Sequence, residues 1–535
     1  MSRRWLSVRG LAAFYVVAAA GYAQTLPPIQ RVEIGAQQEI RVNGAPFFPI
    51  MGWLQSSENL PLVKQCGFNT MAGFYADTPE KMAGIVPYLD ELRKVGLYGV
   101  MPYDSRVKGH PALLGYIHDD EPDMDEMVSD AVVEPGPGLK IGRPLWGMID
   151  GNTGNWVPLD PVENASFTIR LTQPVTVTSF AVTVTVYEGV SWIKELRFEG
   201  DGKEIARQQI DPQKKGPQRC VLEHPAAFRN LRVSVTQWER KANSWASVQE
   251  IEGFDAHGKN VLLSVPRRVP RTPPEEIVRR YRAVKEKDPS RPVFVTFTAA
   301  FIPAMGKWSE TERQELYGSF ARGADVVGFD IYPIYGWNRP EWIPLVHDGT
   351  SLLKKVAGGK PVYAFIETTK GSRWITPARQ LDVTPEHIAA EAWSAICGGA
   401  TAIAYFTHRW VPDFAEFGVP LENRAALKAL NERIARLAPA ILAPASARRI
   451  SVSSGGVSVV WKATEEKKGV LTIFAVNNDG AFKEAKAVFS VPELNAGDTV
   501  VVVDENRSIS AQGGSFEDAF APMAVHIYQI PSGAR

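Results

Sequence analysis

The sequence is poor in several features that mark large protein classes. Its 535 residues include only three cysteines, Cys66, Cys220 and Cys397, which lie far apart and lack metal-site spacing. Cys66 and Cys397 occur in helix-like surroundings, so we expect small buried side chains rather than a disulfide. The formal net charge is zero and no basic patch supports a nucleic-acid partner. We therefore expect a globular protein of roughly two to four domains.

Long apolar runs are also missing, except at the N-terminus. Three arginines precede the apolar run Leu11–Ala20, and the small residue Ala23 follows it. This pattern predicts a secretory signal peptide over residues 1–23. The run is short for a membrane span, although an uncleaved anchor is the alternative. We therefore expect a secreted or periplasmic protein with no membrane association after cleavage.

Strand-like and helical segments alternate on both sides of a central region. Before it, apolar runs such as Phe47–Trp53 and Leu113–Ile117 are separated by helical patterns; after it, the alternation runs from Glu275 to Leu437. Eight strands, each expected to precede a helix, would close a (β/α)₈ TIM barrel over residues 30–127 and 270–440. An open doubly wound sheet is the alternative, but no glycine-rich nucleotide loop follows the first strand.

The two remaining regions read as all-β. Residues 128–269 contain short alternating strands without a good helix, and segments rich in Pro flank them, with Gly also dense at the first. This predicts a β-sandwich inserted after the fourth barrel strand. Residues 445–535 return to alternating strands and predict a C-terminal β-sandwich.

Acids, aromatic residues and histidines gather at the ends of the expected barrel strands, where barrel enzymes place their active sites. The strand Leu113–Ile117 ends in His-Asp-Asp-Glu-Pro, and a later strand ends at Glu367. Glu121 and Glu367 are the predicted catalytic residues; a surface turn and a helix-capping glutamate are the simpler alternatives. The predicted substrate-binding residues are Trp53, Tyr103, His118, Asp120, Asp330, Tyr332, Trp337, His408 and Trp410.

Two carboxyl groups beside aromatic walls suit glycoside cleavage. One carboxylic acid protonates the leaving oxygen, while the other attacks the anomeric carbon or activates water. Six aromatic residues are available in the loops to stack on sugar rings, and we expect two or three to line the cleft. They are Trp53, Tyr103, Trp308, Trp337, Trp374 and Trp410.

The barrel region resembles the clan A glycoside hydrolases, which are retaining enzymes. The resemblance rests on NGAPFFPIMGW near the start, on GFDIYP, and on the two glutamates after strands four and seven. It implies that Glu121 is the acid/base, that Glu367 is the nucleophile about 5 Å away, and that Tyr332 approaches the nucleophile. That clan usually has asparagine before the acid/base residue, whereas this chain has Asp120, which could accept the same hydrogen bond from the sugar.

The insert has a resemblance of its own. IDGNTGNWV at residues 149–157 and SVQEIEGFDA at residues 247–256 are similar to the two ends of discoidin-type, galactose-binding-like sandwiches. The resemblance implies sugar binding and a possible structural calcium, with Asp150 and Asn152 as candidates; no other cofactor is expected. A sandwich that only shapes the cleft is the alternative. The C-terminal region resembles the accessory β-domains that follow many glycosidase barrels.

We therefore expect an exported retaining glycoside hydrolase that acts on a plant or microbial oligo- or polysaccharide. Its partner is carbohydrate, and its oligomeric state is open. Three alternatives remain: a transglycosylase with the same site, a catalytically inactive barrel that binds glycans, and a hydrolase with a metal at His118–Asp123. The metal would need further oxygen ligands.

Overall fold

A computed structural model describes residues 26–242, 245–467 and 469–531, so the expected signal peptide lies outside the described residues. The chain forms two compact units. One comprises the residues up to Met124 and from Thr272 onward, and the other comprises Asp125–Arg271. Over the ranges that the structure describes, no helix is both long and apolar enough to cross a membrane.

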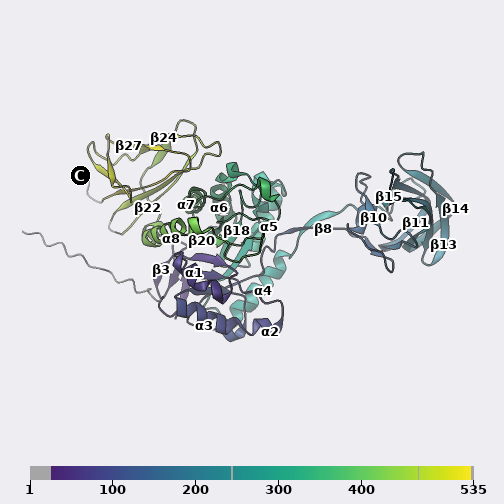
Figure 1. The fold of residues 1–535 in the computed structure, drawn as a ribbon, viewed down its shortest axis with the longest axis horizontal. Coiled ribbons are helices and arrows are strands. Elements are labelled where there is room, and N and C mark those ends of the chain that lie inside the picture. Colours follow the sequence, from purple (N-terminus) through teal and green to yellow (C-terminus); the bar gives the residue numbers. More distant parts are fainter. Residues whose placement is uncertain (1–25, 243–244, 468, 532–535) are drawn as a thin grey trace, which may run out of the picture. The chain divides into compact units, whose positions relative to one another are not determined.

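The first unit contains a closed barrel of eight parallel strands, which confirms the barrel prediction (Figure 1). In chain order the strands are β4 (Ile50–Trp53), β5 (Thr70–Ala72), β6 (Tyr98–Met101), β7 (Leu113–Ile117), β17 (Val293–Phe297), β18 (Val326–Asp330), β19 (Val362–Glu367) and β20 (Ala402–Phe406). Strand β7 pairs directly with β17, so the insert interrupts the sequence without separating neighbouring strands.

Apolar side chains on both faces of the strands explain why the barrel forms. In β19, Tyr363 and Phe365 belong to the apolar cluster inside the barrel, whereas Val362, Ala364 and Ile366 pack in the layer between strands and helices. Strands buried on both faces are typical of parallel sheets. All six residues of β19 are buried, including its last residue, Glu367.

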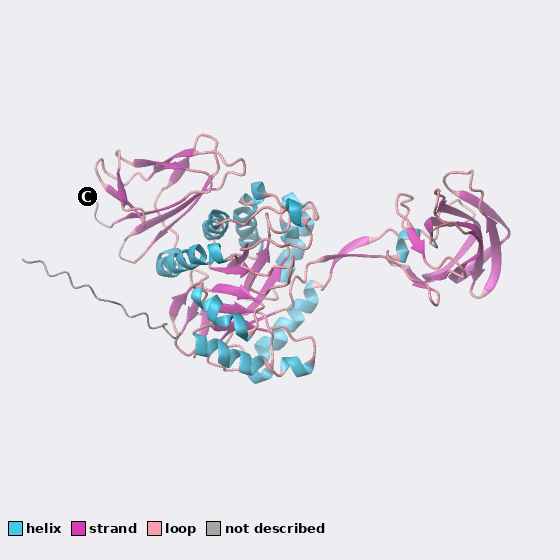
Figure 2. Ribbon diagram, in the orientation of Figure 1, coloured by secondary structure: helices cyan, strands magenta, loops and turns pink. Residues whose placement is uncertain are grey.

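Helices surround these strands (Figure 2). They are α1 (Leu60–Gln65), α2 (Pro79–Met82), α3 (Ile85–Val95), α4 (Pro274–Lys287), α5 (Glu310–Ala321), α6 (Pro344–Val356), α7 (Pro385–Cys397) and α8 (Leu421–Ile441). The expectation of a helix after every strand is wrong at β6, where only the 3₁₀ turn Ser105–Val107 precedes β7. This short connection contains Pro102, Gly109 and Pro111, which do not favour a helix.

The second unit is sandwich-like, but one hydrogen-bonded path joins its strands. The sheet has seven strands in the order β10-β15-β11-β14-β12-β13, with β9 paired to β11. The strands are β9 (Val132–Pro135), β10 (Val157–Leu159), β11 (Ser166–Thr185), β12 (Trp192–Gly200), β13 (Lys203–Gln209), β14 (Gln218–Glu239) and β15 (Ala246–Phe254). Register shifts interrupt the pairing of the long strands β11 and β14, and such bulges let a sheet bend around its own core. A separate antiparallel pair, β8 (Asp125–Val128) and β16 (Arg267–Pro270), opens and closes the unit.

The C-terminal region also forms β-sheets. A three-stranded sheet contains β21 (Ser451–Ser453), β24 (Ala485–Ser490) and β27 (Ser515–Phe520); a five-stranded sheet contains β22 (Val459–Glu465), β23 (Leu471–Asn477), β25 (Thr499–Val502), β26 (Arg507–Ser510) and β28 (Val525–Ile530). The short strands β1 (Val32–Ile34), β2 (Ile40–Val42) and β3 (Ala45–Phe47) precede the barrel.

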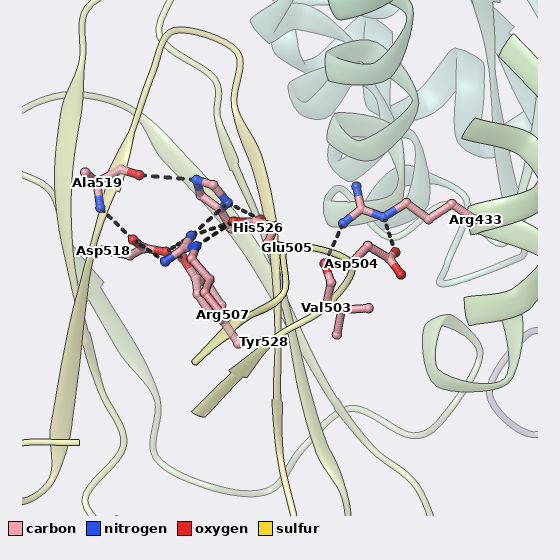
Figure 3. A network of polar contacts seen from close by, with 9 residues as sticks. All are labelled: Arg433, Val503, Asp504, Glu505, Arg507, Asp518, Ala519, His526 and Tyr528. Carbon is pink, nitrogen blue, oxygen red and sulfur yellow. Dashed lines mark hydrogen bonds and ion pairs between the residues drawn. The ribbon is translucent and has the colours of Figure 1, made fainter. Parts of the chain in front are cut away.

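The C-terminal sheets pack on the helix layer of the barrel. The ring of Phe474 stacks on Trp393 of α7 at 5.9 Å between centroids, and Arg433 of α8 pairs with Asp504 at 3.0 Å (Figure 3). Within the sheets, Arg507 bridges Glu505 and Asp518 (Figure 3).

Candidate functional site

The C-terminal ends of the barrel strands surround a cleft of about 630 Å³. Seven of the predicted site residues line it: Trp53, Asp120, Glu121, Asp330, Tyr332, His408 and Trp410. A second hollow of about 480 Å³ shares Glu121, Asp330 and Tyr332 with the first, and Trp337 lines it. Hollows of this size suit small ligands or sugar units.

Glu121 is held in this cleft by an unusual turn. Its φ of 48° places the backbone in the left-handed region, which side chains other than Asn and Asp rarely adopt. The Glu121 N–H donates to the carbonyl of Thr296 at 3.2 Å, and its own carbonyl accepts from the N–H of Met124 at 3.1 Å. Strained backbone of this kind gathers at functional sites.

Asp123 anchors the turn that carries Glu121. Its buried carboxylate accepts hydrogen bonds from the N–H of Thr298 at 2.8 Å, the hydroxyl of Thr298 at 2.7 Å and the hydroxyl of Tyr317 at 2.7 Å. Burial is the main cause that raises the pKa of Asp123 to about 6. Asp123 therefore ties the turn after β7 to the end of β17.

The acidic run after β7 points in several directions. Asp119 is exposed and pairs with Arg280 at 2.7 Å, while the Nε2 atom of His118 lies 2.8 Å from the carbonyl of Gly323. Burial lowers the pKa of His118. His118 is therefore not among the residues that line the cleft, and only Asp120 and Glu121 of this run are. In the described part of the chain, no group of three or more His, Cys, Asp or Glu residues could hold a metal ion.

Asp330, the last residue of β18, lies against Glu121. The two carboxyl groups form a hydrogen bond, and the Tyr332 hydroxyl is hydrogen-bonded to Asp330 as well. Burial, followed by the charges of Glu121 and Asp120, raises the pKa of Asp330 well above its usual range. The cleft thus holds a hydrogen-bonded carboxyl pair that joins the ends of strands β7 and β18.

Glu367 has a different environment. Its side chain is 0% exposed, and it is not among the residues that line either hollow. One carboxylate oxygen accepts from the N–H of Ile334 at 2.8 Å, and the other accepts from the N–H of Tyr335 at 2.6 Å. A carboxyl–carboxyl hydrogen bond joins it to Glu391 of α7. Burial raises the pKa of Glu367 to about 7, and burial together with the charge of Glu367 raises that of Glu391 well above its usual range.

The bonds of Glu367 brace the loop after β18. That loop carries Tyr332 and Trp337 to the cleft, so Glu367 contributes to the wall without facing it. Tyr103 is also outside the lining: its ring packs against Tyr116 at 5.1 Å between centroids. The sequence therefore located the strand ends correctly but did not determine which way each side chain points.

Aromatic residues form much of the remaining wall. Four of the six candidates line the two hollows, more than expected: Trp53, Trp337, Trp374 and Trp410. Sequence reasoning missed Arg373, whose guanidinium lies 4.6 Å from the ring centroid of Trp410 and 5.2 Å from that of Trp374. The signal was present, because Arg373 directly precedes Trp374 in the loop after β19. Glu416 was missed as well, and it also lines the cleft.

His408 completes this wall. Its Nε2 atom lies 3.1 Å from the carbonyl of Leu54, and burial lowers the pKa of His408. The imidazole is therefore neutral at pH 7, and Arg373 is the one cation among the residues that line the larger cleft in the described structure.

The insert contains a separate aromatic feature. The rings of Trp156 and Trp245 stack at 5.5 Å between centroids, and the guanidinium of Arg143 lies 4.2 Å from the ring centroid of Trp156. Nearby in the sequence, the Asp150 carboxylate accepts from the N–H of Asn152 at 2.8 Å and from the Asn155 amide at 2.6 Å. These bonds hold the loop that was expected to bind calcium, and calcium binding there stays a prediction.

No protein-family model matches this chain, and no curated protein matches it. Among solved structures, it is similar to a rhamnosidase from Novosphingobium sp. PP1Y, with 9% identity over 91% of this chain and 82% of that chain and a TM-score of 0.38. It is similar to an Anoxybacillus alpha-amylase with 13% identity over 49% of this chain and 57% of that chain, at a TM-score of 0.32. A family 32 carbohydrate-binding module from C. perfringens, solved with galactose, has 15% identity over 24% of this chain and 98% of that chain, at a TM-score of 0.20. These values identify no family.

Proposed function

We propose that the barrel cleaves glycosidic bonds with retention of configuration and that Glu121 is the acid/base. The observation that supports this proposal is the carboxyl pair in an aromatic-walled cleft at the mouth of the barrel. Aromatic faces suit sugar rings, and a pair of carboxyl groups supplies the acid and the nucleophile of a double displacement. The proposed substrate is an oligo- or polysaccharide of plant or microbial origin that an exported enzyme would meet.

The resemblance implies that Glu367 is the nucleophile. This role stays a prediction, and it would require Glu367 to lose stabilising contacts. Before it could attack a sugar, it would have to give up two buried hydrogen bonds, to the N–H groups of Ile334 and Tyr335, and enter the cleft. Each N–H left buried without a partner costs about 1–3 kcal/mol.

The test measures release of the aryl group from a panel of activated aryl glycosides that covers the common sugars and both anomers. Glu121→Ala should slow substrates with poor leaving groups far more than activated ones, because only the former need a proton from the enzyme. Equal losses on both would contradict the acid/base role. Glu432→Gln, an exposed glutamate on α8, is the matched control.

Three further measurements separate the alternatives. Sugar transfer to an added alcohol, in preference to water, would indicate a transglycosylase. Glycan binding without release, unchanged in Glu121→Gln, would indicate an inactive binding barrel. Loss of activity with a chelator would indicate a metal-dependent hydrolase.

A further inference from the structure

We infer that Asp330, rather than Glu367, is the second catalytic carboxyl group and attacks the anomeric carbon while Glu121 protonates the leaving oxygen. This inference rests on the proposed function and assigns a residue that the resemblance places elsewhere. It depends on where the Asp330 and Glu121 carboxyl groups lie, on their separation and on the charges around them.

The position of Asp330 is the first argument. The two hollows at the barrel mouth share Glu121 and Asp330, so the pair lies where the hollows meet. A glycosidic bond placed at this junction would have its sugar in one hollow and its leaving group in the other. Trp374 lines both hollows, and Trp410 and Trp337 add one aromatic face to each.

The separation of the two groups is the second argument. The carboxyl groups of Asp330 and Glu121 are hydrogen-bonded to each other. Retaining enzymes hold their carboxyl groups about 5 Å apart, whereas inverting enzymes need roughly 6.5–9.5 Å to admit a water molecule. A hydrogen-bonded pair is much closer to the retaining separation, and a small side-chain movement would admit the anomeric centre.

The charge state of the pair is the third argument. Double displacement needs one protonated and one ionised carboxyl group at the same pH. Burial and the charges of Glu121 and Asp120 raise the pKa of Asp330 well above its usual range, so Asp330 holds a proton in the free protein. Through the hydrogen bond between the two groups, this proton passes to Glu121 before Asp330 attacks. The Tyr332 hydroxyl is placed to donate to the Asp330 carboxylate once the proton resides on Glu121.

The steps balance with water as the only co-reactant. An Asp330 oxygen bonds to the anomeric carbon as the bond to the leaving oxygen breaks, and the leaving oxygen takes the proton from Glu121. Water then attacks the same carbon and gives a proton to Glu121, while the ester bond to Asp330 breaks. Both carboxyl groups return to their starting states after two inversions at carbon.

The experiment compares Asp330→Asn, Asp330→Gly, Glu367→Gln and Glu367→Gly in the full-length protein, with the exposed Asp348→Asn on α6 as the matched control. Aryl release is measured on the best substrate of the wild-type panel, and thermal melting verifies that each variant is folded. We expect Asp330→Asn to lose at least about 10³-fold in kcat with little change in melting temperature. Added azide should rescue Asp330→Gly and give a glycosyl azide of inverted configuration.

The possible outcomes are distinguishable. Comparable rates for wild type and Asp330→Asn would overturn the inference and leave the proposed function intact. Azide rescue with inversion in Glu367→Gly, but not in Asp330→Gly, would return the nucleophile to Glu367. A retained azide product from Asp330→Gly would make Asp330 the acid/base and overturn the assignment. No release by the wild type from any substrate would overturn the proposed function, and the inference with it.

Discussion

Two strands of the same barrel end near a glutamate, and the two glutamates lie in opposite environments. After β7, a left-handed turn at Glu121 directs the carboxyl group into the cleft, where it meets Asp330. At the end of β19, Glu367 is fully buried and binds the backbone of the loop after β18. A carboxylate at a strand end therefore becomes a cleft residue or a structural brace according to the turn that follows.

The largest expected effect is on catalysis. Glu121→Gln should lower kcat on substrates with poor leaving groups by about 10²–10⁴-fold, the usual range for a general acid, and should leave the melting temperature nearly unchanged. Glu367→Gln should lower the melting temperature, since an amide nitrogen would face a backbone N–H, while the activity per folded molecule falls far less. Steady-state kinetics, corrected for the fraction of folded protein, test this prediction. A larger loss of kcat in Glu367→Gln than in Glu121→Gln would contradict the different roles of the two glutamates.

The next effect is on stability. Glu367→Ala leaves the N–H groups of Ile334 and Tyr335 buried without their partner, so we expect a loss of roughly 2–5 kcal/mol in the free energy of unfolding. Denaturant titration measures this loss. Glu121→Ala serves as the comparison and should cost much less, because the Glu121 side chain is only half-buried. Equal costs would show that both glutamates support the fold to the same degree.

A smaller effect concerns pH. The folded state raises the pKa of Glu367 to about 7, so between about pH 5 and 7 the folded protein holds a proton that the unfolded chain has lost. The corresponding stability is complete below the ordinary pKa of a glutamate and is lost as the pH rises through about 7, by roughly 3 kcal/mol. Burial and the charge of Glu367 also raise the pKa of Glu391 well above its usual range, so Glu391→Gln removes the second raised acid of the pair and should flatten the decline relative to wild type and to Glu432→Gln. Parallel curves of melting temperature against pH for all three proteins would contradict the prediction.

The smallest effect concerns the turn itself. Because Glu121 has a φ of 48°, Glu121→Gly should be more stable than Glu121→Ala by about 1 kcal/mol, since glycine adopts this conformation without steric cost. Chemical denaturation of the two variants measures the difference. The opposite order would mean that the turn is not held in the left-handed region in solution.

Much of the fold was predictable because its signals are local. Apolar runs of strand length, helical patterns between them and a gap in the alternation indicated the barrel and the two β regions. The connection after β6 was the exception, because counting strands suggested a helix where a chain with two prolines forms only a 3₁₀ turn. In the insert, short-range alternation indicated strands but could not reveal that they join into one continuous bent sheet.

The candidate site, like the fold, was predictable from the sequence only in part. The sequence alone determined that carboxyl groups and aromatic residues lie at the carboxyl ends of the barrel strands, because each strand is a continuous apolar run and the end of that run marks the end of the strand. The contacts of Glu121 with Asp330 and of Glu367 with Glu391 arise only when the chain is folded. Those pairings depend on backbone turns, on neighbouring strands and on how α7 packs against β19, so no local pattern specifies them.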